Sequence, residues 1–224
     1  MKRISQILLV ILSVAFFTGC EQSDDYYLDY DKTSISYEGT IYDYLKHKPG
    51  VYDSLILVLE RLPDLKAKLN SESKGYTYFA VNNRSFELAI ANLNTVRESE
   101  GQQPLYLEDI QLNILDSIAN RYLIEEEISI ELIKPYLDGY SVKSSKYDYG
   151  MHAQYRVLTA SGIVGGGEQQ IIFSDVNSSI YQRYWQSANT KSVDLKTKNG
   201  LLHTLSSQHD FAFGKLNKYL TKSK

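Results

Sequence analysis

The chain has 224 residues, a net charge of −3 and one cysteine. This length is enough for one large domain or two small ones. The slightly acidic balance argues against a nucleic-acid partner, because binding along phosphates requires clustered Lys and Arg residues. Tyrosine is abundant, with 19 residues, and this excess suits either a β-rich core or an extracellular interaction surface.

The N-terminus has the pattern of an export signal. A short positive stretch, Met1–Arg3, precedes an apolar stretch from Ile7 to Phe17 that is too short to cross a bilayer as a mature helix. Thr18-Gly19-Cys20 follows. Small residues before a cysteine resemble a bacterial lipobox, so residues 1–19 are predicted to be a lipoprotein signal peptide and Cys20 the lipid attachment site. The alternative is an ordinary secretory signal that contains Cys20.

Residues 20–36 are predicted to form a lipidated tether. The acidic run Glu21–Asp25 resembles the surface-export signal that some Gram-negative bacteria use, although a plain soluble tether would also be acidic. A diacylglycerol together with an amide-linked acyl chain anchors a protein stably in a membrane. We therefore expect an outer-membrane lipoprotein, and the sequence leaves open which face of that membrane it occupies.

Short helices are predicted between residues 40 and 70. Thr40 with Asp43 has the spacing of a capping box, which opens a helix that ends before Pro49-Gly50. Apolar residues then recur every three or four positions, which is typical of amphipathic helices, and Pro63 divides them. The apolar residues are Val51, Leu55, Leu59, Leu62, Leu65 and Leu69.

The next stretch is predicted to be a strand that runs directly into a helix. Tyr76–Val81 is rich in aromatic and β-branched residues, as in a buried strand. Asn82-Asn83 ends the strand and can cap the helix that follows, because an Asn side chain accepts hydrogen bonds from first-turn amides. Apolar residues at helical spacing predict this helix over residues 84–94.

The middle of the chain is predicted to contain an exposed insertion at Thr95–Pro104 and then a further helix over residues 107–122. Glu125–Glu127 is a run of carboxylates that could help to hold a cation, but adjacent carboxylates without other ligands usually form a solvated edge. Ser129 is predicted to cap a short helix.

From residue 140 onward the pattern alternates as in strands. Met151–Val157 and Ile171–Phe173 are predicted strands. The glycine-rich Ser161–Gly167 between them is interpreted as a hairpin tip, because a phosphate-binding loop would need a helix after it. Ser192–Lys198 and Leu201–Leu205 flank Asn199-Gly200, which predicts a second hairpin.

An aromatic cluster precedes that second hairpin. Tyr181, Tyr184 and Trp185 would share one side if this piece were helical, because their spacing is i, i+3 and i+4. Such a cluster could stack on a sugar or anchor a protein partner. The alternative is that the three rings simply cover the sheet.

Two of these stretches resemble the signatures of the fasciclin-type (FAS1) domain. The first resembles TVFAPTNEAF and differs from it at Val81 and Asn82. The second resembles NGVVHVID and differs from it at Thr204 and Ser206, while Arg121-Tyr122 stands where the family has a Tyr-His motif. The matching residues are Thr77, Phe79, Ala80, Asn83, Phe86, Asn199, Gly200 and His203.

The resemblance implies one FAS1-like domain at residues 37–220, with insertions near 95–104 and 146–190. The implied fold is α+β, a β-sandwich or wedge with flanking helices. The change of the hydrophobic pattern along the chain, from helical spacing to strand-like alternation, agrees with this fold. His203 is expected to be a buried structural histidine that bonds to the backbone. The resemblance further implies an extracellular adhesion or ligand-binding module.

The expected function is a lipid-anchored cell-envelope interaction module that binds a protein partner. The alternative is a surface glycan-binding lipoprotein beside a nutrient-uptake system, which requires Tyr181, Tyr184 and Trp185 to be exposed and coplanar. No catalytic or metal-binding motif supports an enzyme, so we expect no catalytic residue, metal or cofactor. An enzyme would instead need a deep polar pocket with mutually hydrogen-bonded titratable groups.

Overall fold

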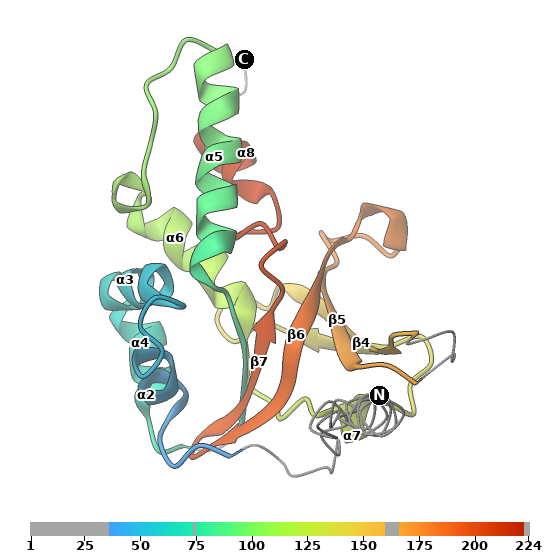
Figure 1. The fold of residues 1–224 in the computed structure, drawn as a ribbon. Coiled ribbons are helices and arrows are strands. Elements are labelled where there is room, and N and C mark those ends of the chain that lie inside the picture. Colours follow the sequence, from blue (N-terminus) through green and yellow to red (C-terminus); the bar gives the residue numbers. More distant parts are fainter. Residues whose placement is uncertain (1–35, 74, 160–165, 222–224) are drawn as a thin grey trace, which may run out of the picture. The chain divides into compact units, whose positions relative to one another are not determined.

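A seven-stranded sheet in the order β2-β1-β7-β6-β5-β4-β3 forms the centre of the protein (Figure 1). The computed structural model describes residues 36–73, 75–159 and 166–221, so the predicted signal peptide, Cys20 and almost all of the tether lie outside the described residues. The strands are β1 (Tyr76–Ala80), β2 (Leu123–Ile124), β3 (Tyr140–Lys143), β4 (Gly150–Val157), β5 (Gln169–Asp175), β6 (Gln186–Thr197) and β7 (Gly200–Leu205).

The sheet is mixed and nearly closes on itself. β1 and β7 are parallel, and the other neighbouring strands are antiparallel. Ile124, at the end of β2, forms an isolated antiparallel bridge with Ser144, directly after β3. The two ends of the sheet are therefore joined at this bridge. The sheet and the helices around it confirm the α+β class predicted from the sequence.

Helices flank the sheet, and α2, α3 and α4 pack against one another on one side of it (Figure 1). The predicted capping box is present at the first of them, because the Thr40 side chain accepts from the Asp43 amide and the Asp43 carboxylate accepts from the Thr40 amide. The helices are α2 (Ile41–Lys46), α3 (Asp53–Arg61), α4 (Pro63–Asn70), α5 (Asn83–Ser99), α6 (Leu112–Ala119), α7 (Ile130–Ile133) and α8 (Lys215–Leu220).

Two helical predictions need correction. α5 continues to Ser99, well into the segment predicted as an exposed insertion at 95–104. Arg97 explains the extension, because its guanidinium donates to the carbonyls of Gln103 and Leu220 and ties the end of the helix to the C-terminal segment. The helix predicted over 107–122 is divided into η2 (Leu107–Asp109), α6 and η3 (Asn120–Tyr122).

The division before α6 also has a local cause. Arg61 on α3 donates to the carbonyl of Leu107 at 2.7 Å and to the carbonyl of Ile110 at 2.6 Å. These carbonyls would accept from backbone amides in a continuous helix, and Ile110 instead adopts an extended conformation. A long-range contact thus interrupts a pattern that is helical in the sequence.

The segment near 146–190 contributes β4, β5 and the first part of β6 to the sheet. β4 and β5 pair antiparallel, so the glycine-rich segment joins two hairpin strands as predicted. Residues 161–165, which make up most of the glycine-rich Ser161–Gly167, lie outside the described residues, so the conformation of the predicted hairpin tip stays a prediction.

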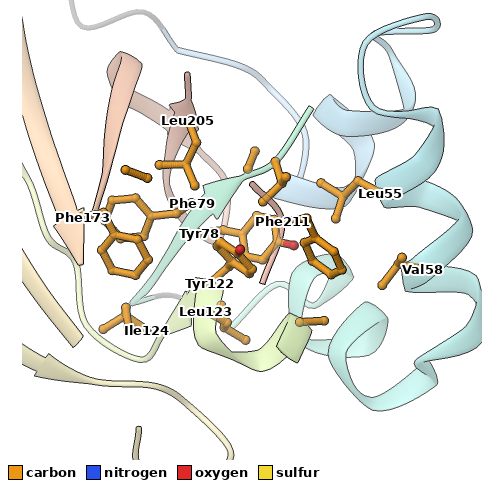
Figure 2. Packing of buried hydrophobic residues seen from close by; sticks show 14 of the residues in the cluster. Leu55, Val58, Tyr78, Phe79, Tyr122, Leu123, Ile124, Phe173, Leu205 and Phe211 are labelled. Carbon is orange, nitrogen blue, oxygen red and sulfur yellow. The ribbon is translucent and has the colours of Figure 1, made fainter. Parts of the chain in front are cut away.

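The core is built on both faces of β1 (Figure 2). Phe79 stacks on Phe173 of β5, with the ring centroids 3.7 Å apart and the planes at 7°. On the other face, Tyr78 lies toward Tyr122 and Phe211, and Leu55 from α3 lies beyond them. Burial of each large aromatic side chain contributes about 2–3 kcal/mol, so β1 joins the sheet to the helices.

Asn199 and Gly200 hold the beginning of β7 against the helices and β1. The buried Asn199 side chain accepts from the Ile41 amide at 2.9 Å and donates to the Leu69 carbonyl at 2.9 Å, which joins the start of α2 to the end of α4. Gly200 pairs with Tyr76, and a Cβ at position 200 would lie only 1.9 Å from the Tyr76 carbonyl oxygen. Position 200 therefore requires glycine.

Two fully or nearly buried histidines complete the core. His203 donates from Nε2 to the Ile128 carbonyl at 2.8 Å and accepts the Asp194 amide at Nδ1 at 3.1 Å, which requires a neutral ring. His209 Nε2 lies 2.8 Å from the Tyr122 hydroxyl, which accepts from the Ala212 amide. Burial lowers the pKa of His203 to about 4 and the pKa of His209 to about 3.

Gly200→Ala is expected to lower the free energy of unfolding by about 3 kcal/mol, because the added methyl overlaps the β1 backbone. Chemical denaturation measures the effect. Gly101→Ala is the matched control, since Gly101 also has a positive φ but nothing lies within 4 Å of the position that its added methyl would take. The control should cost about 1 kcal/mol. Equal losses for the two variants would contradict the steric argument.

The histidines predict a loss of stability in mild acid. Their folded pKa values lie below the ordinary value of 6.5, so below that pH the unfolded chain binds protons that the folded protein does not. Stability is therefore complete above pH 6.5 and falls as the pH decreases toward the folded pKa values, by about 1.4 kcal/mol per pH unit for each histidine. Urea denaturation across this range measures the slope, and His203→Gln should reduce it. A slope unchanged by His203→Gln would contradict the assignment.

Candidate interaction surface

The residues of the two sequence signatures hold the fold together. Thr77 Oγ1 donates to the Glu126 carbonyl at 2.6 Å and accepts from the Ile128 amide at 2.8 Å, which fixes β1 to the segment after β2. Asn83 caps α3 from a distance, because its Oδ1 accepts from the Ser54 amide at 2.9 Å. Phe86 packs against Phe211 with 4.2 Å between the ring centroids. These side chains serve the interior and the joints between elements.

The aromatic cluster predicted from the sequence lies in the connection from β5 to β6, which we call the aromatic loop (residues 176–185; Figure 1). Its exposed side chains include Ile180, with 85% of its surface accessible, Tyr181, with 58%, and Tyr184, with 49%. Removing the exposed apolar area of such side chains from water is favourable, by about 25 cal/mol per Å². The loop therefore presents a small surface that favours contact with another molecule.

The conformation of the aromatic loop is not the helix that would place its three rings on one side. Only Gln182–Tyr184 forms a 3-10 turn, η4, and Trp185 is extended. Trp185 is half-buried, its indole N–H donates to the Ser179 carbonyl at 2.7 Å, and its ring lies 4.8 Å from that of His152 on β4. Trp185 therefore anchors the loop to the sheet, and the two tyrosines face outward.

Arg183 lies between the exposed tyrosines. Its guanidinium carbon is 4.8 Å from the centroid of the Tyr184 ring and 5.3 Å from that of the Tyr181 ring. The two rings are 6.4 Å apart and nearly perpendicular, at 79°. Each contact is attractive because the face of an aromatic ring is electron-rich. The three side chains thus support one another on the surface.

The beginning of the aromatic loop is fixed in an unusual backbone conformation. Asn177 and Ser178 both have positive φ angles, of 51° and 55°. The Asp175 carboxylate stabilises this turn by accepting from the Asn177 amide at 2.7 Å, and Lys215 on α8 donates to the Asn177 side chain at 2.9 Å. The loop is therefore anchored at both ends.

A buried ionic cluster supports that turn. Asp175 Oδ2 accepts from Arg121 Nε at 2.9 Å and lies 3.2 Å from Lys215 Nζ, and the Asp175 and Arg121 side chains are each only 5% exposed. The Arg121 guanidinium also stacks over Tyr149, 3.7 Å from the ring centroid. No sequence signal marks this cluster, because its members come from distant segments and share no spacing pattern.

A second apolar turn is connected to the loop through His152. This side chain donates from Nε2 to the carbonyl of Asp138 at 2.8 Å while its ring packs against Trp185. The turn before Asp138 presents Leu137, with 89% of its surface accessible, and Tyr136, with 48%. His152 therefore joins two exposed apolar segments, and burial lowers its pKa, which favours the neutral ring that fits between them.

A polar hollow of about 230 Å³ lies elsewhere, beside Glu125 and Ser145. Lys68 Nζ is 2.6 Å from Ser145 Oγ and 2.7 Å from the Glu125 carboxylate. The Ser145 hydroxyl also donates to the Glu125 carboxylate, at 2.7 Å, so the three side chains form one hydrogen-bonded group. The same contact with Lys68 lowers the pKa of Glu125. The arrangement is that of an ion pair at the rim of a shallow hollow.

The described residues offer no group of three or more His, Cys, Asp or Glu side chains placed to hold a metal ion. This includes Glu125–Glu127, whose carboxylates instead contact Lys68 or Tyr140 or face solvent. Among the helices in this part of the chain, none combines the length and apolar character that a bilayer crossing requires.

No protein family model and no curated protein sequence matches the chain. A similar solved structure is that of a FAS1 domain pair from the insect cell adhesion molecule fasciclin I, with a TM-score of 0.50 and 14% sequence identity. The similarity covers 75% of this chain and 49% of that chain, so the present chain spans about half of the fasciclin I domain pair. The fold is therefore FAS1-like, as the two signatures predicted.

Asp175→Asn is expected to lower the free energy of unfolding by about 3–5 kcal/mol, because it leaves Arg121 and Lys215 buried without their shared carboxylate. The aromatic loop should also lose its rigid base, so amide hydrogen exchange should accelerate in residues 177–185. Glu87→Gln is the control, since it breaks an exposed pair with Arg84 whose side chains are both 62% exposed. That change should cost less than about 1 kcal/mol. Unchanged exchange in the loop would contradict the supporting role of Asp175.

Proposed function

We propose that this chain is a lipid-anchored interaction module of a bacterial cell envelope and that its FAS1-like domain binds a protein partner through the aromatic loop. The observation that carries the proposal is the combination of exposed rings with a rigid support. Tyr181 and Tyr184 are exposed, while Trp185 and Asp175 fix the two ends of the loop. A loop that is ordered before binding loses little conformational entropy in a complex, and aromatic side chains dominate the energy of protein interfaces.

The geometry favours a protein over a glycan as the partner. Sugar stacking needs a flat, open ring surface, but Tyr181 and Tyr184 are nearly perpendicular and Trp185 is half-buried with its N–H already bonded. Ile180 offers an aliphatic side chain that is 85% exposed, which suits an apolar pocket in a protein. Binding of a surface glycan remains the alternative function.

The proposed location rests on the N-terminal sequence. Cys20 follows an apolar segment and small residues in the manner of a lipobox, and the described domain begins after a short acidic tether. Acylation at Cys20 would hold the domain close to the outer membrane, where a partner of the cell envelope is within reach. The fold similarity to a domain pair of a cell adhesion molecule supports a role in surface interaction.

The experiment uses the full chain in cells that produce it, with the photo-reactive residue p-benzoylphenylalanine in place of Ile180. Illumination should yield a covalent protein adduct. The adduct should be lost in Tyr181→Ala/Tyr184→Ala and absent when the photo-reactive residue replaces Tyr106, which is also 58% exposed but lies outside the loop. In the same cells, Cys20→Ser should move the protein from the membrane fraction to the soluble fraction.

Failure to form a protein adduct from position 180 would contradict the protein-binding proposal. A glycan array then separates the alternatives, since selective sugar binding that is lost in Tyr181→Ala/Tyr184→Ala would establish the glycan function. Membrane retention of the Cys20→Ser variant would contradict lipid anchoring independently of the partner.

A further inference from the structure

Arg183 is exposed, and its guanidinium has no acceptor among residues 36–73, 75–159 and 166–221. Several other arginines in this part of the chain are engaged. Arg61 and Arg97 donate to backbone carbonyls, Arg121 bonds to Asp175, and Arg84 pairs with Glu87. Arg183 instead contacts ring faces, which leave its N–H groups available at the edge of the guanidinium plane.

The tyrosines restrict the position of this guanidinium without neutralising it. A ring face provides an attraction of about 0.5–1 kcal/mol at an exposed site and accepts no conventional hydrogen bond in the guanidinium plane. Two ring contacts, at 4.8 Å and 5.3 Å, therefore limit the freedom of the side chain while its planar set of donors stays unused. Such a guanidinium is pre-organised to bind a planar anion through two parallel hydrogen bonds.

The segment around Arg183 carries positive charge and has no carboxylate of its own to neutralise it. Between Asp175 and Asp194 the sequence contains no carboxylate, and its charged residues there are Arg183 and Lys191. The Asp175 carboxylate is buried and bonded to Arg121 and Lys215, so it does not serve Arg183. The exposed part of the aromatic loop is thus cationic and apolar at once.

We infer that Arg183 binds a carboxylate of the protein partner, and that this partner presents an Asp or Glu side chain next to an apolar residue. The carboxylate lies in the guanidinium plane, and the apolar neighbour contacts Ile180 and the exposed edges of Tyr181 and Tyr184. This inference rests on the proposed function and adds the chemistry of the partner segment. In this complex Arg183 selects a partner that carries a carboxylate, and the two tyrosine rings provide apolar contact area.

The test uses the photo-reactive full chain with position 180 substituted, in the cells described above. Arg183→Glu should reduce the adduct about tenfold or more, since it places two carboxylates together, and Arg183→Gln should also reduce it. Arg183→Lys should retain part of the yield, because the charge remains but the bidentate geometry is lost. Arg84→Glu is the matched control and should leave the yield unchanged, since Arg84 lies outside the loop and is 62% exposed.

Mass spectrometry of the adduct then identifies the partner segment. An Asp or Glu within a few residues of the cross-linked position is expected, and its replacement by Arg should restore adduct formation with the Arg183→Glu variant. An adduct that persists in Arg183→Glu but disappears in Tyr181→Ala/Tyr184→Ala would overturn the inference and leave the protein-binding function intact. A cross-linked segment without a carboxylate would also overturn it. The lack of any adduct would instead contradict the proposed function itself.

Discussion

The close contact between the beginning of β7 and β1 is the constraint on which the rest of the fold depends. Gly200 allows the two parallel strands to approach, and the Asn199 side chain next to it bonds to the start of α2 and the end of α4. One dipeptide therefore sets the register of the central strands and the position of the N-terminal helices. Phe79, two strand positions beyond Thr77, can then stack on Phe173 and complete the core.

Local signals made much of this fold predictable from sequence. Asn82 caps α5, Thr40 and Asp43 form a capping box, and Asn199-Gly200 turns the chain between β6 and β7. Each depends on residues a few positions apart, so the chemistry is visible in the sequence. The interruption before α6 was not predictable, because it depends on Arg61, which is far away in the chain.

The candidate surface was predictable only in part, for the same physical reason. The sequence identified Tyr181, Tyr184 and Trp185 as a cluster, but their roles depend on distant partners. Trp185 is turned inward by His152, and the base of the loop is held by an ionic cluster that gathers β5, η3 and α8. Tertiary contacts thus decide which of the three aromatic side chains are exposed, whereas their proximity to one another follows from the sequence alone.

The bridge between Ile124 of β2 and Ser144, directly after β3, has a consequence for the exposed edges of the sheet. Free strand edges in neighbouring molecules tend to pair through their unpaired backbone N–H and C=O groups. In this fold the outermost strands engage each other, which shields backbone groups from neighbours. The bridged part of each edge is thereby less available for backbone pairing with the edge strand of another molecule.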